Sequence, residues 1–375
     1  MSFLLNKPTV FVIGKEYEIV LSLRENGICS VLVGGDTYYE ENTGVLSSEK
    51  NYAKIRVPQK ALDKTKEYTV KYRKSINRKA YFSELGEAEF ERFEFKPIEK
   101  TDNINIYHSA DVHYIFDVAK NTISYFGEDT DLIILNGDIG EVESEQNYFD
   151  ILNFTGEISD GRIPVVMARG NHDTRGRLAE RYTDYFPANH KDTYYTFEIG
   201  NMRGIVLDCG EDKPDSYDSY GGDEYGGVNI FEIYRRRELG FLKSIEPDPE
   251  KLTFAVSHMC PAQIHPVSGS KFDIERELYS EYNRELARIG IKFMINGHIH
   301  RTYVLKKNDE KSLLPHEYNV IVGSALSKND EKYEVVGTAI NVTKDKINFK
   351  FTDSHHNVIE EYVLDNKTEI IEKIN

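Results

Sequence analysis

A chain of 375 residues is long enough to form two domains with a large buried core. Its 63 Asp and Glu residues outnumber its 47 Lys and Arg residues, which gives a formal net charge of −16. A charge of this sign repels phosphate backbones and anionic lipid, so it disfavours nucleic acid and a membrane surface as partners.

The cysteines and the apolar segments indicate a cellular location. Cys29, Cys209 and Cys260 are odd in number and far apart, which argues against a disulfide framework and suits a reducing compartment. The N-terminal residues lack the pattern of a signal peptide, and no apolar run approaches membrane-spanning length. We therefore expect a soluble, cytoplasmic protein.

The first hundred residues have the pattern of a small all-β unit. Short segments alternate apolar and polar residues, and Asn26-Gly27 is a typical turn. These segments are 15–23, 29–33, 52–57, 68–72 and 90–95. We predict an immunoglobulin or fibronectin III-like β-sandwich over residues 1–100. The segment contains no histidine, so metal or acid–base chemistry is not expected there.

From residue 101 to residue 375 the pattern changes to short apolar strands that alternate with helical segments, which indicates an α/β domain. The predicted helices are 115–126, 148–154, 231–245 and 274–289. The predicted strands are 104–107, 132–135, 165–167, 205–207, 252–256 and 292–295, with further β segments after Pro315. The arginine run 235–237 is expected on the solvated face of its helix.

Potential metal ligands follow five of the predicted strands. The carboxyl ends of strands in an α/β sheet meet along one edge, so side chains far apart in the sequence converge there. Glycines precede Asp138, Asn171 and His298 and allow the backbone to approach an ion closely. The candidate ligands are Asp111, His113, Asp138, Asn171, His258, His298 and His300.

Together these motifs resemble those of the calcineurin-like metallophosphoesterases. The matching residues are Asp111-x-His113, Gly137-Asp138, Gly170-Asn171-His172-Asp173, His258 and Gly297-His298-x-His300. The resemblance implies a four-layer α/β sandwich of two sheets flanked by helices. It also implies two metal sites, one formed by Asp111, His113, Asp138 and His300 and the other by Asp138, Asn171, His258 and His298.

The implied activity is hydrolysis of phosphate mono- or diesters on a small phosphorylated substrate. A metal-bridging hydroxide attacks phosphorus, His172 acts as general acid, and Asp173 orients His172 or holds its loop. Imidazole and oxygen ligands without thiolate suit transition metals, so we expect two ions of Mn, Fe or Zn.

The chain also departs from one branch of this family. Purple acid phosphatases, which resemble it in having a fibronectin-like domain before the catalytic one, carry a tyrosine ligand where this chain has Glu141. Their third motif tends to end in Glu, whereas Asp173 is common in cyclic-nucleotide phosphodiesterases and nucleases, which favours diesters. The acidic charge argues against a nuclease. A non-enzymatic alternative is a metal-stabilised protein that binds a protein partner through its N-terminal sandwich.

Several further residues have alternative interpretations. Arg175 or Arg177 could contact a phosphate oxygen, although a surface role is the simpler reading. His108 is expected to point into the fold, and His355-His356 to form a solvated turn. His265, Tyr220 and Tyr225 are candidates for the lining of a substrate pocket.

Overall fold

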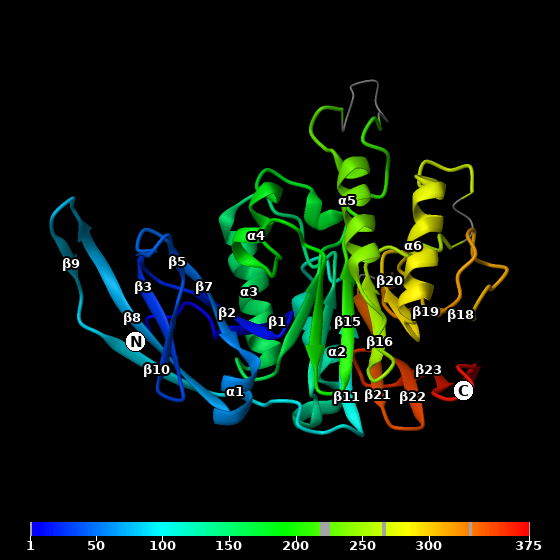
Figure 1. Cartoon of the computed structure of the whole chain (residues 1–375), viewed down its shortest axis with the longest axis horizontal. Coiled ribbons are helices and arrows are strands. Elements are labelled where there is room, and N and C mark those ends of the chain that lie inside the picture. The colour runs from blue at the N-terminus through cyan, green and yellow to red at the C-terminus, as the bar shows by residue number, and fades with distance from the viewer. Residues whose placement is uncertain (1, 218–225, 265–267, 330–331, 375) are drawn as a thin grey trace.

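The computed structural model describes residues 2–217, 226–264, 268–329 and 332–374. Tyr220, Tyr225 and His265 lie outside these described residues. Two large sheets form the centre of the molecule, and a third, smaller sheet lies at the N-terminal end (Figure 1). Within the described ranges, no helix is both long enough and apolar enough to cross a lipid bilayer.

The largest sheet has eleven strands in the order β24-β23-β22-β21-β11-β12-β13-β1-β2-β7, with β20 paired to β21. The bounds are β1 Thr9–Ile13, β2 Glu16–Ser22, β7 Tyr52–Pro58, β11 Ile104–Ser109, β12 Leu132–Asn136, β13 Val165–Ala168, β20 Ala325–Asn329, β21 Lys332–Val342, β22 Lys346–Thr352, β23 Val358–Asp365 and β24 Ile371–Lys373. Strands β11, β12 and β13 are parallel, so their carboxyl ends lie at one edge.

The second sheet has six strands in the order β14-β15-β16-β17-β19-β18. The bounds are β14 Tyr195–Ile199, β15 Met202–Leu207, β16 Leu252–Ser257, β17 Phe293–Asn296, β18 Tyr303–Leu305 and β19 Asn319–Val322. Strands β15, β16, β17 and β19 are parallel, as expected for strands joined by crossover helices.

Helices cover the outer faces of both sheets. The longer helices are α2 Phe116–Ile123, α3 Glu145–Ser159, α5 Phe231–Ser244 and α6 Arg276–Ile289. The short ones are α1 Gln59–Thr65, α4 Tyr182–Tyr185 and the 3₁₀ helices η1 Ser124–Asp129, η2 His172–Thr174 and η3 Ala179–Arg181. The four predicted helices are thus present, although the first continues as a 3₁₀ turn after Ile123.

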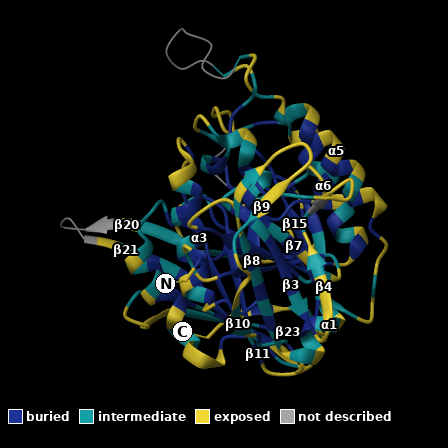
Figure 2. Cartoon of the chain, turned by 90° about the vertical axis from the view of Figure 1, so that its left-hand side faces the viewer, coloured by how far each residue is buried: buried dark blue, intermediate teal, exposed yellow. Residues whose placement is uncertain are grey.

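Three hydrophobic cores separate four layers. Along β12, Leu132 and Ile134 face the core between the two sheets, whereas Ile133 and Leu135 face the core under α2 and α3. A third core lies between the six-stranded sheet and helices α5 and α6. In Figure 1, α3 lies toward the N-terminal strands and α5 and α6 lie on the opposite side. Figure 2 shows the buried strands inside and exposed residues along α5 and α6. The predicted layered α/β architecture is therefore present.

The N-terminal region is rich in strands, as predicted, but an immunoglobulin or fibronectin topology is not confirmed. Strand β1 pairs in parallel with β13, with Phe11 opposite Val165, so β1, β2 and β7 belong to the large sheet. The remaining strands form the sheet β10-β8-β3-β4, with β9 beside β8, and a small hairpin β5-β6. Their bounds are β3 Gly27–Val33, β4 Asp36–Tyr39, β5 Glu41–Asn42, β6 Val45–Leu46, β8 Glu67–Arg78, β9 Ser83–Leu85 and β10 Glu89–Glu94. A domain boundary near residue 100 stays a prediction.

Candidate metal centre

Five loops bring the predicted ligands together where the two sheets end. The loops follow β11, β12 and β13 of the large sheet and β16 and β17 of the six-stranded sheet. Two clusters result, one of Asp111, His113 and His300 and one of Asp138, His258 and His298; within each, the candidate ligand atoms lie within 4.8 Å of one another. The seventh predicted ligand, Asn171, places Oδ1 3.0 Å from Nδ1 of His298. All seven side chains therefore converge.

The backbone at this point adopts conformations that are uncommon for residues with a side chain. Five of the seven candidate ligands have positive φ angles: Asp111 56°, His113 44°, Asp138 54°, His298 77° and His300 52°. Such angles cost free energy and persist where the surrounding structure imposes them, often at functional sites. The tight turns after the strands are thus held by the fold.

Two motif glycines allow the loops after β12 and β13 to touch. A Cβ atom on Gly137 would lie 2.6 Å from the Cα of Gly170, and a Cβ atom on Gly170 would lie 2.2 Å from Oδ1 of Asp138. Both separations are shorter than any van der Waals contact allows. The glycines are therefore required by close backbone approach at the centre.

Asp138 belongs to the second cluster and also approaches the first. Its Oδ2 atom is 3.1 Å from Nε2 of His258 and 3.8 Å from Nε2 of His113. Oδ1 of Asp111 in turn lies 3.3 Å from Nε2 of His300. Asp138 thus approaches one histidine from each cluster.

The hydrogen bonds of the histidines fit a bound metal. Nδ1 of His258 donates to the carbonyl of Asn136 at 2.6 Å, which leaves the lone pair of Nε2 directed at the carboxylates. Among the described residues, Nε2 of His113 is buried and has no hydrogen-bond partner, with Oδ2 of Asp138 3.8 Å away. Ligand atoms about 2.1 Å from one ion lie about 3 Å apart, which is the spacing of Asn171 and His298.

The electrostatics of the centre also favour a cation. Burial lowers the pKa of His258, but the nearby charges of Asp138 and Asp111 raise it to about 10. Burial raises the pKa of Asp138, but His258, His172 and His113 hold it well below its usual range. Two buried carboxylates thus stabilise positive charge here.

Asp173 holds the loops of the centre. Its Oδ2 atom accepts hydrogen bonds from the backbone amides of Gly170 at 2.8 Å and Asp138 at 2.9 Å. Burial and the charge of Asp138 raise the pKa of Asp173 to about 7. Of the two roles expected for Asp173, these contacts support holding the loop.

His172 lies at the open side of the centre, with its ring 4.8 Å from that of His113 between centroids. Its Nδ1 atom is 2.7 Å from Oε1 of Glu141, and its Nε2 atom is 3.1 Å from Nη1 of Arg175. Glu141 is therefore the carboxylate partner of His172. The sequence analysis noted Glu141 only as a difference from the pattern of purple acid phosphatases and predicted no role for it.

Acidic residues after a sixth strand also reach the centre and were not predicted. Glu211, in the loop after β15, accepts two hydrogen bonds from Arg175, at 2.6 and 2.7 Å. Asp212 lies 3.3 Å from Arg175 and 3.9 Å from Nε2 of His298. The sequence could have indicated Glu211 and Asp212, because they follow a strand as the candidate ligands do. Arg175 is thus not a simple surface residue.

The remaining predicted positions lie away from the two clusters. His108 is fully buried, and its Nε2 atom accepts a hydrogen bond from Asn136 at 3.1 Å. Burial lowers its pKa to about 3, which keeps its ring neutral. His356 hydrogen-bonds the carbonyl of Asn121 at 2.8 Å, and Arg177 lines an open cleft together with Arg175.

Similarity to known proteins agrees with this geometry. A probable cyclic nucleotide phosphodiesterase from Fibrobacter succinogenes is 26% identical over 99 residues, and the match spans 25% of this chain and 38% of that relative. The solved structure of purple acid phosphatase PPD1 from seeds of yellow lupin (Lupinus luteus) has a TM-score of 0.58 at 11% identity, over 97% of this chain and 75% of that one. A structure of PhoD has a TM-score of 0.61 at 11% identity, over 100% and 92%. These two structures share the fold.

The family model described as calcineurin-like phosphoesterase matches residues 104–302, from the start of β11 to just beyond His300. The matched range is more than half of the 375 residues and contains every candidate ligand. The chain belongs to the calcineurin-like phosphoesterase family.

Proposed function

We propose that this protein is a dinuclear metal-dependent phosphoester hydrolase. The observation that carries the proposal is the pair of adjacent ligand clusters, in which Asp138 of one cluster lies close to His113 of the other, at the point where the strands of both sheets end. One ion is held by Asp111, His113, Asp138 and His300, and the other by Asp138, Asn171, His258 and His298.

The ligand set decides which metals suit the centre. It combines four imidazoles with two carboxylates and one amide and contains no thiolate, so Mn, Fe and Zn fit better than Mg or Ca. When bound, two such ions supply positive charge to the phosphoryl oxygens and lower the pKa of a water molecule.

The protein itself supplies the proton for the leaving group. Water adds to phosphorus and releases a proton to the solvent, the bond to the ester oxygen breaks, and His172 donates a proton to that oxygen. Glu141 accepts the hydrogen bond from Nδ1 of His172 and fixes the orientation of its ring. Arg175, held by Glu211, lies on the same side as His172 and is a candidate contact for a phosphoryl oxygen.

The proposed substrates are small phosphate mono- or diesters. A more specific candidate is a cyclic nucleotide, which is favoured by the partial similarity to the probable phosphodiesterase and by Asp173 in the third motif. The net charge of −16 disfavours long nucleic acids as substrates.

Hydrolysis of p-nitrophenyl phosphate and of bis-p-nitrophenyl phosphate tests this proposal. The metal-free protein is loaded with Mn²⁺, the metal content is measured, and release of p-nitrophenol is followed. We expect about two ions per chain and turnover that is lost on chelation and restored by Mn²⁺.

The same measurement separates the alternatives. A higher kcat/KM for the diester supports a phosphodiesterase. Two bound ions without turnover of either ester would instead favour a binding protein with a structural metal centre.

A further inference from the structure

An arginine cleft, lined by Arg169, Arg175 and Arg177, lies beside the metal centre. It has a volume of about 570 Å³ and is formed by the turns between β13 and η3 and by the start of α5. Among the described residues that line it, Glu180 is the one carboxylate. The walls thus carry three positive charges against one negative charge, in a chain whose net charge is −16. A space of this size accommodates part of a small ligand.

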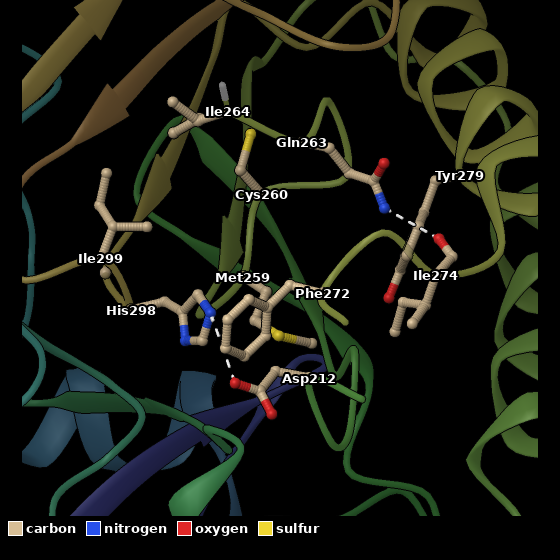
Figure 3. A pocket seen from close by; sticks show the side chains of 11 residues that line it. Asp212, Met259, Cys260, Gln263, Ile264, Phe272, Ile274, Tyr279, His298 and Ile299 are labelled. Atoms are coloured by element: carbon tan, nitrogen blue, oxygen red, sulfur yellow. Dashed lines mark hydrogen bonds and ion pairs between the residues drawn. The ribbon is translucent and has the colours of Figure 1, made fainter. Parts of the chain in front are cut away.

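Arg175 connects the arginine cleft to the metal centre. Its Nη1 atom lies 3.1 Å from Nε2 of His172. Its Nη2 atom lies 3.3 Å from Asp212, and Figure 3 shows that Asp212 points toward His298, a proposed metal ligand. None of the seven candidate ligands, all of which the structure describes, lines the cleft itself. The cleft therefore begins beside a residue proposed to contact the phosphoryl group and lies outside the metal centre.

Buried carboxylates fix two of the three arginines from behind. Asp208 pairs with Nη2 of Arg169 at 2.7 Å, and Glu211 accepts two hydrogen bonds from Arg175, at 2.6 and 2.7 Å. Asp208 and Glu211 are buried, and neither lines the cleft. Arg169 and Arg175 are therefore held in place, and part of their charge is offset inside the protein.

Arg177 is the cation of the cleft whose charge is not offset in this way. The residue is exposed, and its side chain has no hydrogen bond or ion pair within the described ranges. The side-chain amide of Asn229, on the α5 side of the cleft, is likewise unpaired in these parts of the chain. A guanidinium group donates paired hydrogen bonds to a carboxylate or a phosphate. The cleft thus offers accessible donors and a positive charge to an anion.

We propose that the arginine cleft binds a second anionic group of the substrate, a carboxylate or a phosphate on the alcohol part of the phosphoester. This proposal rests on the proposed function, because the metal centre must hold the phosphoryl group that is hydrolysed. Arg177 and Asn229 donate hydrogen bonds to the second anion. Val228 and Phe231 form an apolar wall against which the carbon atoms between the two anionic groups pack. The substrate class is thus small phosphoesters with two anionic groups.

Phosphonates, which are not hydrolysed, test the cleft without relying on turnover. Binding of 4-phosphonobutyrate and of its neutral amide to the Mn²⁺-loaded protein is measured by calorimetry, and 3-phosphonopropionate and its amide form a second pair with a shorter spacer. In at least one pair we expect the carboxylate to bind about tenfold more tightly than the amide, because its hydrogen bonds are charge-assisted. This advantage should decrease as the salt concentration rises, since Arg177 is exposed.

Two substitutions of Arg177 locate the effect. Arg177→Gln removes the charge, so the carboxylate should bind within about twofold of its amide. Arg177→Glu reverses the charge, so the amide should bind more tightly than the carboxylate. Arg284→Gln, at an exposed position of α6, makes the same change in net charge and should keep the advantage of the carboxylate. Thermal melting checks that each variant is folded.

The outcomes separate the two proposals. If the carboxylate keeps its advantage in Arg177→Gln and Arg177→Glu, it binds elsewhere and the cleft proposal is wrong. If esters are hydrolysed but both carboxylates bind the wild type within about twofold of their amides, the cleft proposal is wrong and the proposed function stands. If the metal-loaded protein neither binds phosphonates nor hydrolyses esters, the proposed function is wrong and the cleft proposal fails with it.

Discussion

At the scale of single residues, His172 is distinguished by its two neighbours. Glu141 faces one ring nitrogen and Arg175 faces the other, and neither residue is among the candidate ligands. The proposed metal ligands and the proposed proton donor are therefore different residues. Metal binding and proton transfer can be tested by different substitutions.

Glu141→Gln should lower kcat about 10- to 100-fold without loss of metal. The glutamine can still accept the hydrogen bond from Nδ1 of His172, but it no longer provides a carboxylate that holds the ring in place. Glu143→Gln, two residues away and exposed, is the control. Steady-state kinetics and metal analysis check the prediction, which fails if both variants have wild-type kcat.

Asp138→Asn and His172→Ala should have different effects. Asp138 belongs to one cluster and lies 3.8 Å from Nε2 of His113 in the other, so Asp138→Asn should reduce both bound metal and turnover. His172→Ala should retain the metals and lose about 10²- to 10⁴-fold in kcat. Loss of metal from His172→Ala would show that His172 is a ligand and not the acid.

At the scale of elements, helix α5 holds the loop that brings Glu211 to the centre. The arginine run 235–237 was predicted to be solvated, and for Arg235 this is wrong, because its side chain is fully buried. Arg235 donates to the carbonyl of Cys209 at 2.7 Å and pairs with Glu275 at 2.8 Å. The helix turns this one arginine inward, whereas the side chain of its neighbour Arg236 is 63% exposed.

Arg235→Leu should destabilise the protein by about 3–5 kcal/mol, because Glu275 loses its buried partner. Arg236→Leu should change the free energy of unfolding by less than about 0.5 kcal/mol, since the side chain is at the surface. Urea denaturation of both variants gives the comparison. Equal effects would mean that the buried ion pair adds nothing to stability.

Replacement of a glycine by alanine should have opposite effects on stability in the turn after β13 and in helix α5. Gly170→Ala should weaken metal binding and lower the melting temperature, because its Cβ would overlap Oδ1 of Asp138. Gly240→Ala, at an exposed position in α5 with no neighbouring atom within 4 Å, should stabilise the protein by about 0.5–1 kcal/mol. Thermal unfolding measures both, and a stabilised Gly170→Ala would contradict the close approach.

At the scale of the whole molecule, the N-terminal strands and the catalytic region share one sheet and one core. Val10 and Ile19 belong to the same hydrophobic cluster as Ile106 and Leu132, and β1 pairs with the edge of β13. A chain without residues 1–100 would expose that edge and part of that core.

We therefore expect the full chain to unfold in one cooperative transition and the deletion of residues 1–100 to leave an insoluble product. Calorimetry of the full chain and expression of the truncated chain check this. A folded, active truncated chain with two separate transitions in the full protein would support two independent domains, divided near residue 100.

The sequence by itself determined the layered architecture, the family resemblance and the set of candidate ligands that the fold brings together. Strands buried on both faces read as short apolar runs, and the motifs stand directly after them. Only the tertiary structure decided three further features: the partner of His172, the burial of Arg235, and the pairing of β1 with β13. The first and third of these features depend on contacts between residues that are distant in the sequence, and the second depends on which face of helix α5 turns inward. The local sequence pattern fixes neither kind of contact. The convergence of the candidate ligands was predictable because the ends of parallel strands meet at one edge, whereas the contacts around them required the fold.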